Sequence, residues 1–147
     1  MSADTGAGST NKGAAAHPRG AQSRPLRILV AEDNAVNIKL MRATLGSLGY
    51  AADYAHDGFE VLEAMRAQTY DLIFMDVRMP GLDGIETTRR IRTAGAGRPR
   101  PHIVALTASD LPSERSACAA AGIDDFLVKP AARAQIVAVL EHCAGAR

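Results

Sequence analysis

Two short runs of hydrophobic residues, "LIFM" at 72–75 and "IVAL" at 103–106, restrict the fold of this chain most strongly. Neither run alternates with polar residues, as a strand exposed on one face does, so a strand formed by either run buries both of its faces. A parallel sheet with helices on each side provides that burial. The two runs therefore predict an α/β protein with a doubly wound parallel sheet.

The rest of the chain supplies the other elements, because short hydrophobic runs alternate with longer amphipathic stretches after Pro25. Asn34 and Asp83 are expected to cap the first and third helices, and Gly49 to end the first. Among the strand orders that right-handed crossovers allow, 2-1-3-4-5 is common for five strands at this size. The predicted strands are 26–31, 51–55, 71–76, 102–107 and 125–128, and the predicted helices are 34–49, 57–68, 84–92, 112–121 and 131–143.

Residues 26–147 are predicted to form one domain, and residues 1–25 a disordered tail or linker. From Met1 to Ser23 the chain has no Val, Ile, Leu, Phe or Tyr, so burial cannot offset the entropy lost on ordering. The formal net charge of +1 gives no overall bias toward nucleic acid or acidic membranes. No stretch approaches the roughly 20 hydrophobic residues that span a bilayer, and no signal-peptide run is present, so we expect a cytoplasmic protein.

The cysteines and histidines do not have the spacing of a zinc site. Cys118 and Cys143 fall in predicted helices, where we expect reduced packing residues. The four histidines are too dispersed in the sequence to form a zinc site, and we expect surface or strand-edge positions for them. These histidines are His17, His56, His102 and His142.

Polar residues stand where four of the predicted strands end, and in a doubly wound sheet ligands bind beyond these carboxyl ends. Each residue alone has an ordinary structural explanation, such as a helix cap or a solvated charge. Together, two carboxylates about 4 Å apart repel by about 4 kcal/mol at an effective dielectric constant of about 20, so a cation is expected among them. Carboxylate ligands with positions left for water and phosphate suit Mg²⁺. The residues are Glu32, Asp33, Asp76, Thr107 and Lys129.

Beside a bound Mg²⁺, the carboxylate of Asp76 can act as a nucleophile toward phosphorus. The cation and Lys129 would neutralise the incoming phosphoryl oxygens, while the Thr107 hydroxyl donates a hydrogen bond. The residues at this edge therefore predict phosphoryl chemistry on Asp76.

Four segments together resemble the receiver domains of two-component response regulators. The resemblance runs from about Leu26 to the C-terminus, and its sequence motifs are most similar to those in receivers of hybrid sensor kinases. It implies the flavodoxin-like (βα)5 fold and a phospho-accepting signalling domain of a phosphorelay rather than an enzyme with outside substrates. The segments are "AEDN" at 31–34, "MDVRMPGLDG" at 75–84, "ALTA" at 105–108 and "DDFLVKP" at 124–130.

The resemblance implies an acceptor and a metal site. Asp76 would take a phosphoryl group from a histidine kinase or a histidine phosphotransfer protein. The domain would catalyse only its own phosphorylation and dephosphorylation. Mg²⁺ would be held by Asp76, Asp33 and the backbone carbonyl of Arg78, with Glu32 acting through water.

The resemblance also implies a switch. Lys129 would contact the phosphoryl group, and the Lys129–Pro130 peptide bond would be cis. Thr107 and Phe126, expected at the ends of neighbouring strands, would form the switch pair. Phosphorylation would then change a surface built from helix 112–121, strand 125–128 and the last helix, which a downstream protein binds.

Three other functions fit parts of the sequence. A phosphate-independent interaction module would keep the fold, but it would have no use for the intact set of acids, Thr107 and Lys129. An aspartate-nucleophile phosphohydrolase typically has a second Asp two residues after the nucleophile, where this chain has Arg78. Nucleic-acid binding lacks aromatic interleaving or a recognition helix, so a solvated helix face and loop are favoured for the arginines. These are Arg89, Arg90, Arg92, Arg98 and Arg100. If the chain is complete, the signal must leave by protein contact or by onward transfer of the phosphoryl group.

Overall fold

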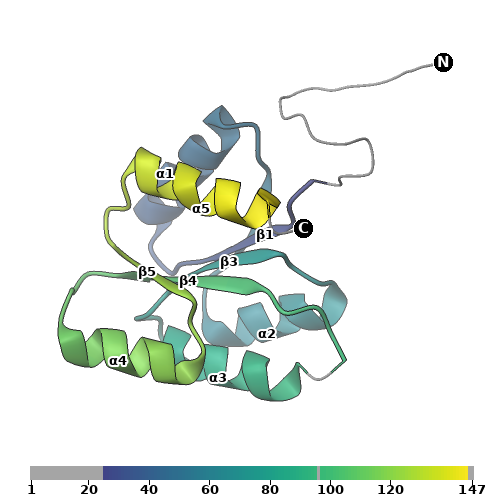
Figure 1. Ribbon diagram of the computed structural model, residues 1–147, viewed down its shortest axis with the longest axis vertical. Helices are drawn as coiled ribbons and strands as arrows, with labels where there is room; N and C mark the ends of the chain where they lie inside the picture. Colours follow the sequence, from purple (N-terminus) through teal and green to yellow (C-terminus); the bar gives the residue numbers. More distant parts are fainter. Residues whose placement is uncertain (1–24, 96, 146–147) are drawn as a thin grey trace.

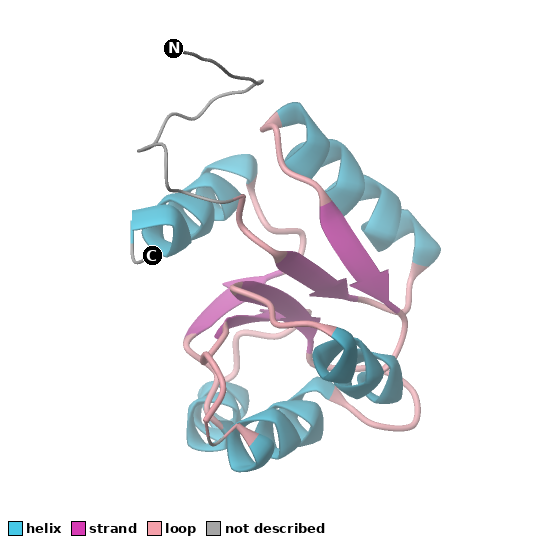
Figure 2. Ribbon diagram, turned by 90° about the vertical axis from the view of Figure 1, so that its right-hand side faces the viewer, coloured by secondary structure: helices cyan, strands magenta, loops and turns pink. Residues whose placement is uncertain are grey.

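A computed structural model describes residues 25–95 and 97–145, and in this part of the chain a five-stranded parallel sheet lies between two layers of helices (Figures 1 and 2). The strand order is β2-β1-β3-β4-β5, which confirms the predicted topology and fold class. Apart from Pro25, the tail predicted over residues 1–25 lies outside the described residues. The strands are β1 (Ile28–Ala31), β2 (Ala52–Ala55), β3 (Leu72–Asp76), β4 (His102–Thr107) and β5 (Asp125–Val128).

The first three helices begin where the sequence supplies a side-chain cap. The Asn34 side chain accepts from the amides of Val36 and Asn37, and Asp57 and Asp83 cap α2 and α3 in the same way. These side chains satisfy amides that have no partner within the helix. The helices are α1 (Ala35–Ser47), α2 (Gly58–Ala67), α3 (Gly84–Ala94), α4 (Pro112–Ala121) and α5 (Arg133–Gly145).

Alternate strand residues face two separate layers of core. Val30 and Phe74 pack with α1 and α5 on one side of the sheet, whereas Leu29 and Met75 pack toward α2, α3 and α4 on the other. Figure 2 shows the two helix layers on opposite sides of the strands. Burial on both faces is what the uninterrupted hydrophobic runs predict.

The boundaries differ from the prediction mainly at the ends of elements. β1 begins at Ile28 rather than Leu26, and α5 begins at Arg133 rather than residue 131. Leu26 is nevertheless buried, so its hydrophobic side chain joins the core just outside the hydrogen-bonded strand. The Lys129–Pro130 peptide bond is cis, as predicted.

Candidate functional site

The predicted polar residues meet at the carboxyl edge of the sheet. Glu32 and Asp33 follow β1 directly, and Lys129 follows β5. Asp76 is the last residue of β3 and Thr107 the last of β4. Because β3 lies between β1 and β4, Asp76 stands at the centre of this edge.

The three acids form a compact group. Ligand oxygens of Glu32, Asp33 and Asp76 lie within 4.8 Å of one another, and among the described residues no other group of three or more potential ligands does so. Glu32 and Asp76 are each 2% exposed, whereas Asp33 is open to solvent. An all-oxygen set with one exposed side fits a hard cation such as Mg²⁺ that keeps part of its water shell.

Lys129 lies between two of these acids. Its Nζ atom is 3.2 Å from Asp76 Oδ2 and 3.3 Å from Glu32 Oε1. Burial acts to lower the pKa of Lys129, but attraction by Asp76 and Glu32 outweighs it and the pKa is raised. The lysine therefore stays protonated and supplies a fixed positive charge at the acidic edge.

The pKa of Asp76 is raised to about 6, first by burial and then by the neighbouring Glu32 carboxyl. Lys129 and the Arg78 amide act in the opposite direction and lower it. The Arg78 N–H donates to Asp76 Oδ1 at 3.2 Å, and the Asn34 N–H donates to Glu32 Oε2 at 3.1 Å. Backbone groups thus hold both buried carboxylates in place.

The Thr107 hydroxyl is bonded to a helix rather than left free. Thr107 Oγ1 donates to Glu114 Oε1 of α4 at 3.0 Å, and the Ser109 N–H donates to Thr107 Oγ1 at 3.1 Å. Glu114 Oε2 also lies 3.5 Å from Arg78 Nη2. The first turn of α4 therefore contacts both β4 and the loop after β3.

Phe126 does not stand at the carboxyl end of its strand. It is the second residue of β5 and pairs with Ala105, whereas Thr107 pairs with Val128. Its half-buried ring packs toward the α2, α3 and α4 side, with the Arg115 guanidinium carbon 4.4 Å from the ring centroid. The expectation that both switch residues stand at strand ends is wrong for Phe126, because β5 continues to Val128, the residue that pairs with Thr107.

The sequence does not predict two residues that lie at the site. Glu114 and Arg115 lie near the start of α4, where an acid in the first turn has an ordinary role at the helix N-terminus. The spacing from Thr107 to Glu114 was the available signal, but it becomes a contact only through the packing of α4 against β4.

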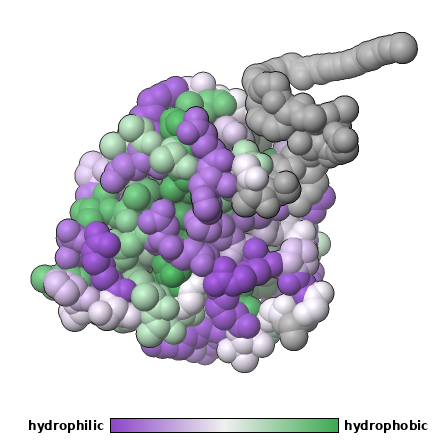
Figure 3. Space-filling model, in the orientation of Figure 1, coloured by the Kyte–Doolittle hydropathy of each residue, from purple (hydrophilic) through white to green (hydrophobic). Residues whose placement is uncertain are grey.

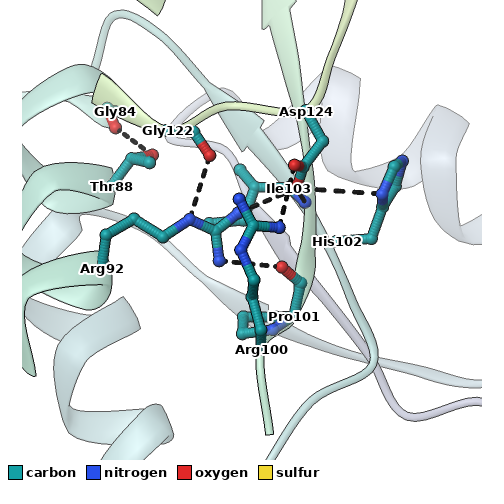
Figure 4. Close-up of polar contacts among 9 residues, drawn as sticks. All are labelled: Gly84, Thr88, Arg92, Arg100, Pro101, His102, Ile103, Gly122 and Asp124. Atoms are coloured by element: carbon teal, nitrogen blue, oxygen red, sulfur yellow. Dashed lines mark hydrogen bonds and ion pairs between the residues drawn. The ribbon is translucent and has the colours of Figure 1, made fainter. Parts of the chain in front are cut away.

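The arginines grouped in the sequence have partners within the chain. Arg92 and Arg100 lie 2.8 and 2.9 Å from the Asp124 carboxylate, and Arg92 also donates to the carbonyls of Gly122 and Pro101 (Figure 4). These contacts join α3 to the segments that precede β4 and β5, so Arg92 is not the solvated residue that the sequence predicts. Arg98 donates to the Met65 carbonyl, and Arg89 and Arg90 contact Glu86.

The two cysteines and two of the histidines pack against other residues of the fold. Cys118 and Cys143 are free and buried, as predicted, and burial raises the pKa of Cys143 to about 11. The rings of His102 and His142 lie 4.9 Å apart despite their separation in sequence, and burial lowers the pKa of His102. His17 lies outside the described residues. None of the helices that the structure describes is long and hydrophobic enough to cross a bilayer.

Fold and site together define an α/β domain with an acidic site at the switch point of its sheet. The sheet has the strand order of flavodoxin-like folds, whose ligands bind at the switch point between β1 and β3. At that point stand a buried aspartate, two further acids and a lysine.

The chain belongs to the response regulator receiver domain family, whose model matches residues 28–141. It is similar to Hybrid signal transduction histidine kinase F of Dictyostelium discoideum, with 42% identity over 114 residues. The match covers 76% of this chain and only 10% of that kinase. The predicted family and its role as a signalling domain of two-component systems are confirmed.

Solved structures agree with this assignment. The receiver domain of the sensor histidine kinase PA1611 from Pseudomonas aeruginosa PAO1, with a magnesium ion in its active-site cleft, has 42% identity and a TM-score of 0.75, and the match covers 83% of this chain and 99% of that one. The receiver domain of Ssk1 from Saccharomyces cerevisiae, crystallised with the histidine phosphotransfer protein Ypd1, has 25% identity and a TM-score of 0.77, over 82% and 90% of the two chains.

Proposed function

We propose that Asp76 accepts a phosphoryl group from a phosphohistidine on a partner protein. A carboxylate oxygen of Asp76 attacks phosphorus, the bond from phosphorus to the histidine nitrogen breaks, and the leaving imidazole takes up a proton. Lys129 offsets negative charge on the phosphoryl oxygens. The observation that carries the proposal is a buried Asp76 carboxylate, 2% exposed and 3.2 Å from Lys129 Nζ, at the centre of the carboxyl edge.

The proposed acceptor is better suited to self-phosphorylation than to turnover of outside substrates. A phosphohydrolase of the aspartate type needs an acid or base close to its nucleophile, and the second residue after Asp76 is Arg78. The Arg78 side chain is 80% exposed and contacts Glu114 instead. The expected result is labelling of the parent chain by a phosphohistidine donor and no labelling of Asp76→Asn.

Glu32, Asp33, Asp76 and the Arg78 backbone carbonyl are proposed to hold Mg²⁺. The close approach of the three carboxylates supports this set, because without a cation their charges repel. When bound, Mg²⁺ neutralises charge that develops on the phosphoryl oxygens. The magnesium ion in the PA1611 receiver structure supports the same choice of metal.

Mg²⁺ binding should weaken sharply in mild acid. A proton and the cation compete for Asp76, whose pKa is about 6. The carboxyl is largely ionised at pH 7.5 and about nine-tenths protonated at pH 5, so the dissociation constant should be about tenfold higher at pH 5. An NMR titration of backbone amides with MgCl₂ at the two pH values measures this ratio. Equal affinities, or shifts remote from Asp76, would contradict the site.

A hydrophobic surface beside the site is proposed to receive the phosphohistidine protein. Val36 and Leu40 of α1 are 64% and 57% exposed. Next to Leu40, a hollow of about 190 Å³ separates α1 from the segment after β5 and reaches Lys129 and Pro130. Exposed hydrophobic residues that adjoin a reactive group mark a protein interaction site. Figure 3 shows hydrophobic residues along its left-hand side, where Figure 1 places the loops that follow β4 and β5.

Leu40→Asp should slow phosphorylation by the protein donor at least about tenfold, because it places a charge in the centre of the docking surface. Phosphorylation by acetyl phosphate, which needs no docking, should change less than about twofold. Leu111→Asp is the matched control, since Leu111 is 61% exposed but lies at the start of α4. Initial rates with each donor measure the effect. Equal slowing by both variants would place the docking surface elsewhere.

A downstream protein is proposed to bind the face formed by α4, β5 and α5. Thr107 and Phe126 couple this face to the acceptor, because both contact the start of α4 through Glu114 and Arg115. A phosphoryl group on Asp76 adds a charge of about −1.5 to −2 and draws the Thr107 hydroxyl toward it. Phe126 and α4 then repack.

A further inference from the structure

Glu114 accepts the hydrogen bond that the Thr107 hydroxyl must donate elsewhere in the proposed switch. Thr107 Oγ1 donates to Glu114 Oε1 at 3.0 Å, while its lone pair accepts from the Ser109 N–H. A threonine hydroxyl carries one proton and donates one hydrogen bond at a time. The bond from Thr107 to Glu114 therefore excludes a bond from Thr107 to a phosphoryl group on Asp76.

The second oxygen of Glu114 faces the other group that a phosphoryl group attracts. Arg78 Nη2 lies 3.5 Å from Glu114 Oε2, and the Arg78 amide donates to Asp76 Oδ1. A phosphoryl group on Asp76 is more negative than a carboxylate and draws Arg78 as well as Thr107. Phosphorylation thus competes with Glu114 for both of these contacts.

Because Glu114 is nearly buried in the first turn of α4, losing its contacts should destabilise the start of this helix. The Glu114 side chain is only 10% exposed, so without its contacts it becomes a nearly buried charge with less compensation. The residue at the start of α4, Leu111, makes no side-chain cap. The first turn is held instead by Glu114 and by Arg115, which contacts Asp110 and the Phe126 ring.

We infer that Glu114 is a positioning residue that keeps Thr107 and the start of α4 in the unphosphorylated arrangement and competes with the phosphoryl group for the Thr107 proton. This inference rests on the proposed function and adds to it an opposing acceptor on α4. Loss of Glu114 should therefore favour the phosphorylated arrangement. Loss of a residue that only stabilises the helix should not change the equilibrium between the two arrangements.

Beryllofluoride, which takes the place of a phosphoryl group on a carboxylate, measures this preference. In the presence of Mg²⁺, Glu114→Ala should bind beryllofluoride about tenfold more tightly than the parent, which corresponds to about 1.4 kcal/mol. Glu114→Gln keeps a neutral acceptor and should have a smaller effect, about threefold. The affinities come from amide shifts during titration, and thermal unfolding of each variant reports whether the fold is retained.

The same substitutions in a Thr107→Val background separate positioning from helix stability. With no hydroxyl to compete for, only the exposed Arg78 is released, so Glu114→Ala should tighten beryllofluoride binding less than about threefold. Glu86→Ala, which removes a first-turn acid from α3, is the matched control and should leave the affinity unchanged.

Equal tightening with and without the Thr107 hydroxyl would overturn the inference, as would no tightening in Glu114→Ala or Glu114→Gln while the parent binds beryllofluoride at Asp76. A parent chain that does not bind beryllofluoride at all would overturn the proposed function first, and the inference with it. The two failures are therefore distinguishable.

Discussion

Replacing Gly84 by alanine is expected to destabilise the domain by roughly 2–4 kcal/mol. A Cβ atom at Gly84 would collide with the backbone carbonyl oxygen of Asp76 and would lie 2.9 Å from Met75 Cγ. Moving either neighbour would disturb the central strand β3, to which both belong. Gly84 itself cannot shift away without breaking the hydrogen bond from its amide to the Val77 carbonyl. Urea unfolding followed by circular dichroism measures the change.

Gly46→Ala is the control for this prediction. Gly46 lies within α1, and a Cβ atom there would meet nothing within 4 Å. Alanine is the better helix former, so this substitution should stabilise the domain by about 0.5 kcal/mol. Similar changes in both variants would mean that the close approach of Gly84 to β3 does not limit the fold.

The strand order could be predicted because the hydrophobic pattern and the chain connections constrain it. β4 and β5 match their predicted bounds, since uninterrupted hydrophobic residues end at a polar residue in each case. β1 was predicted two residues too long, because Leu26 is buried without joining the hydrogen-bonded ladder. Hydrophobicity reports burial, and burial extends beyond the strand.

The convergence of Asp76 with Lys129 could also be predicted, because parallel strands place their carboxyl ends at one edge of the sheet. The contacts of Glu114 with Thr107 and Arg78 could not, since they depend on how α4 packs against β4. The contact of Arg92 with Asp124 could not be predicted either, because Arg92 lies in α3 and Asp124 in the segment before β5. Sequence spacing fixes neighbours along a helix but not partners across elements.

Asp76→Asn is expected to lower phosphorylation by at least about 100-fold, because the amide keeps the shape of the side chain but removes the nucleophile. The fold should survive. Burial and, after it, the neighbouring Glu32 carboxyl raise the pKa of Asp76, so a neutral side chain at this position relieves both costs in the metal-free protein. Phosphorylation with Mg²⁺ and acetyl phosphate, followed by intact mass, compares this variant with the parent. Asp33→Asn is a useful second variant, since it weakens the proposed metal site but leaves the nucleophile in place.

Whether Asp76 is the phosphoryl acceptor is tested by locating the phosphoryl group after transfer from a phosphohistidine protein in the presence of Mg²⁺. We expect one phosphoryl group per chain, labile in both acid and base as an acyl phosphate is, and located on Asp76 by peptide mass spectrometry. We expect no transfer to Asp76→Asn. Equal labelling of parent and variant, or a stable phosphate on a hydroxyl residue, would mean that Asp76 is not the acceptor.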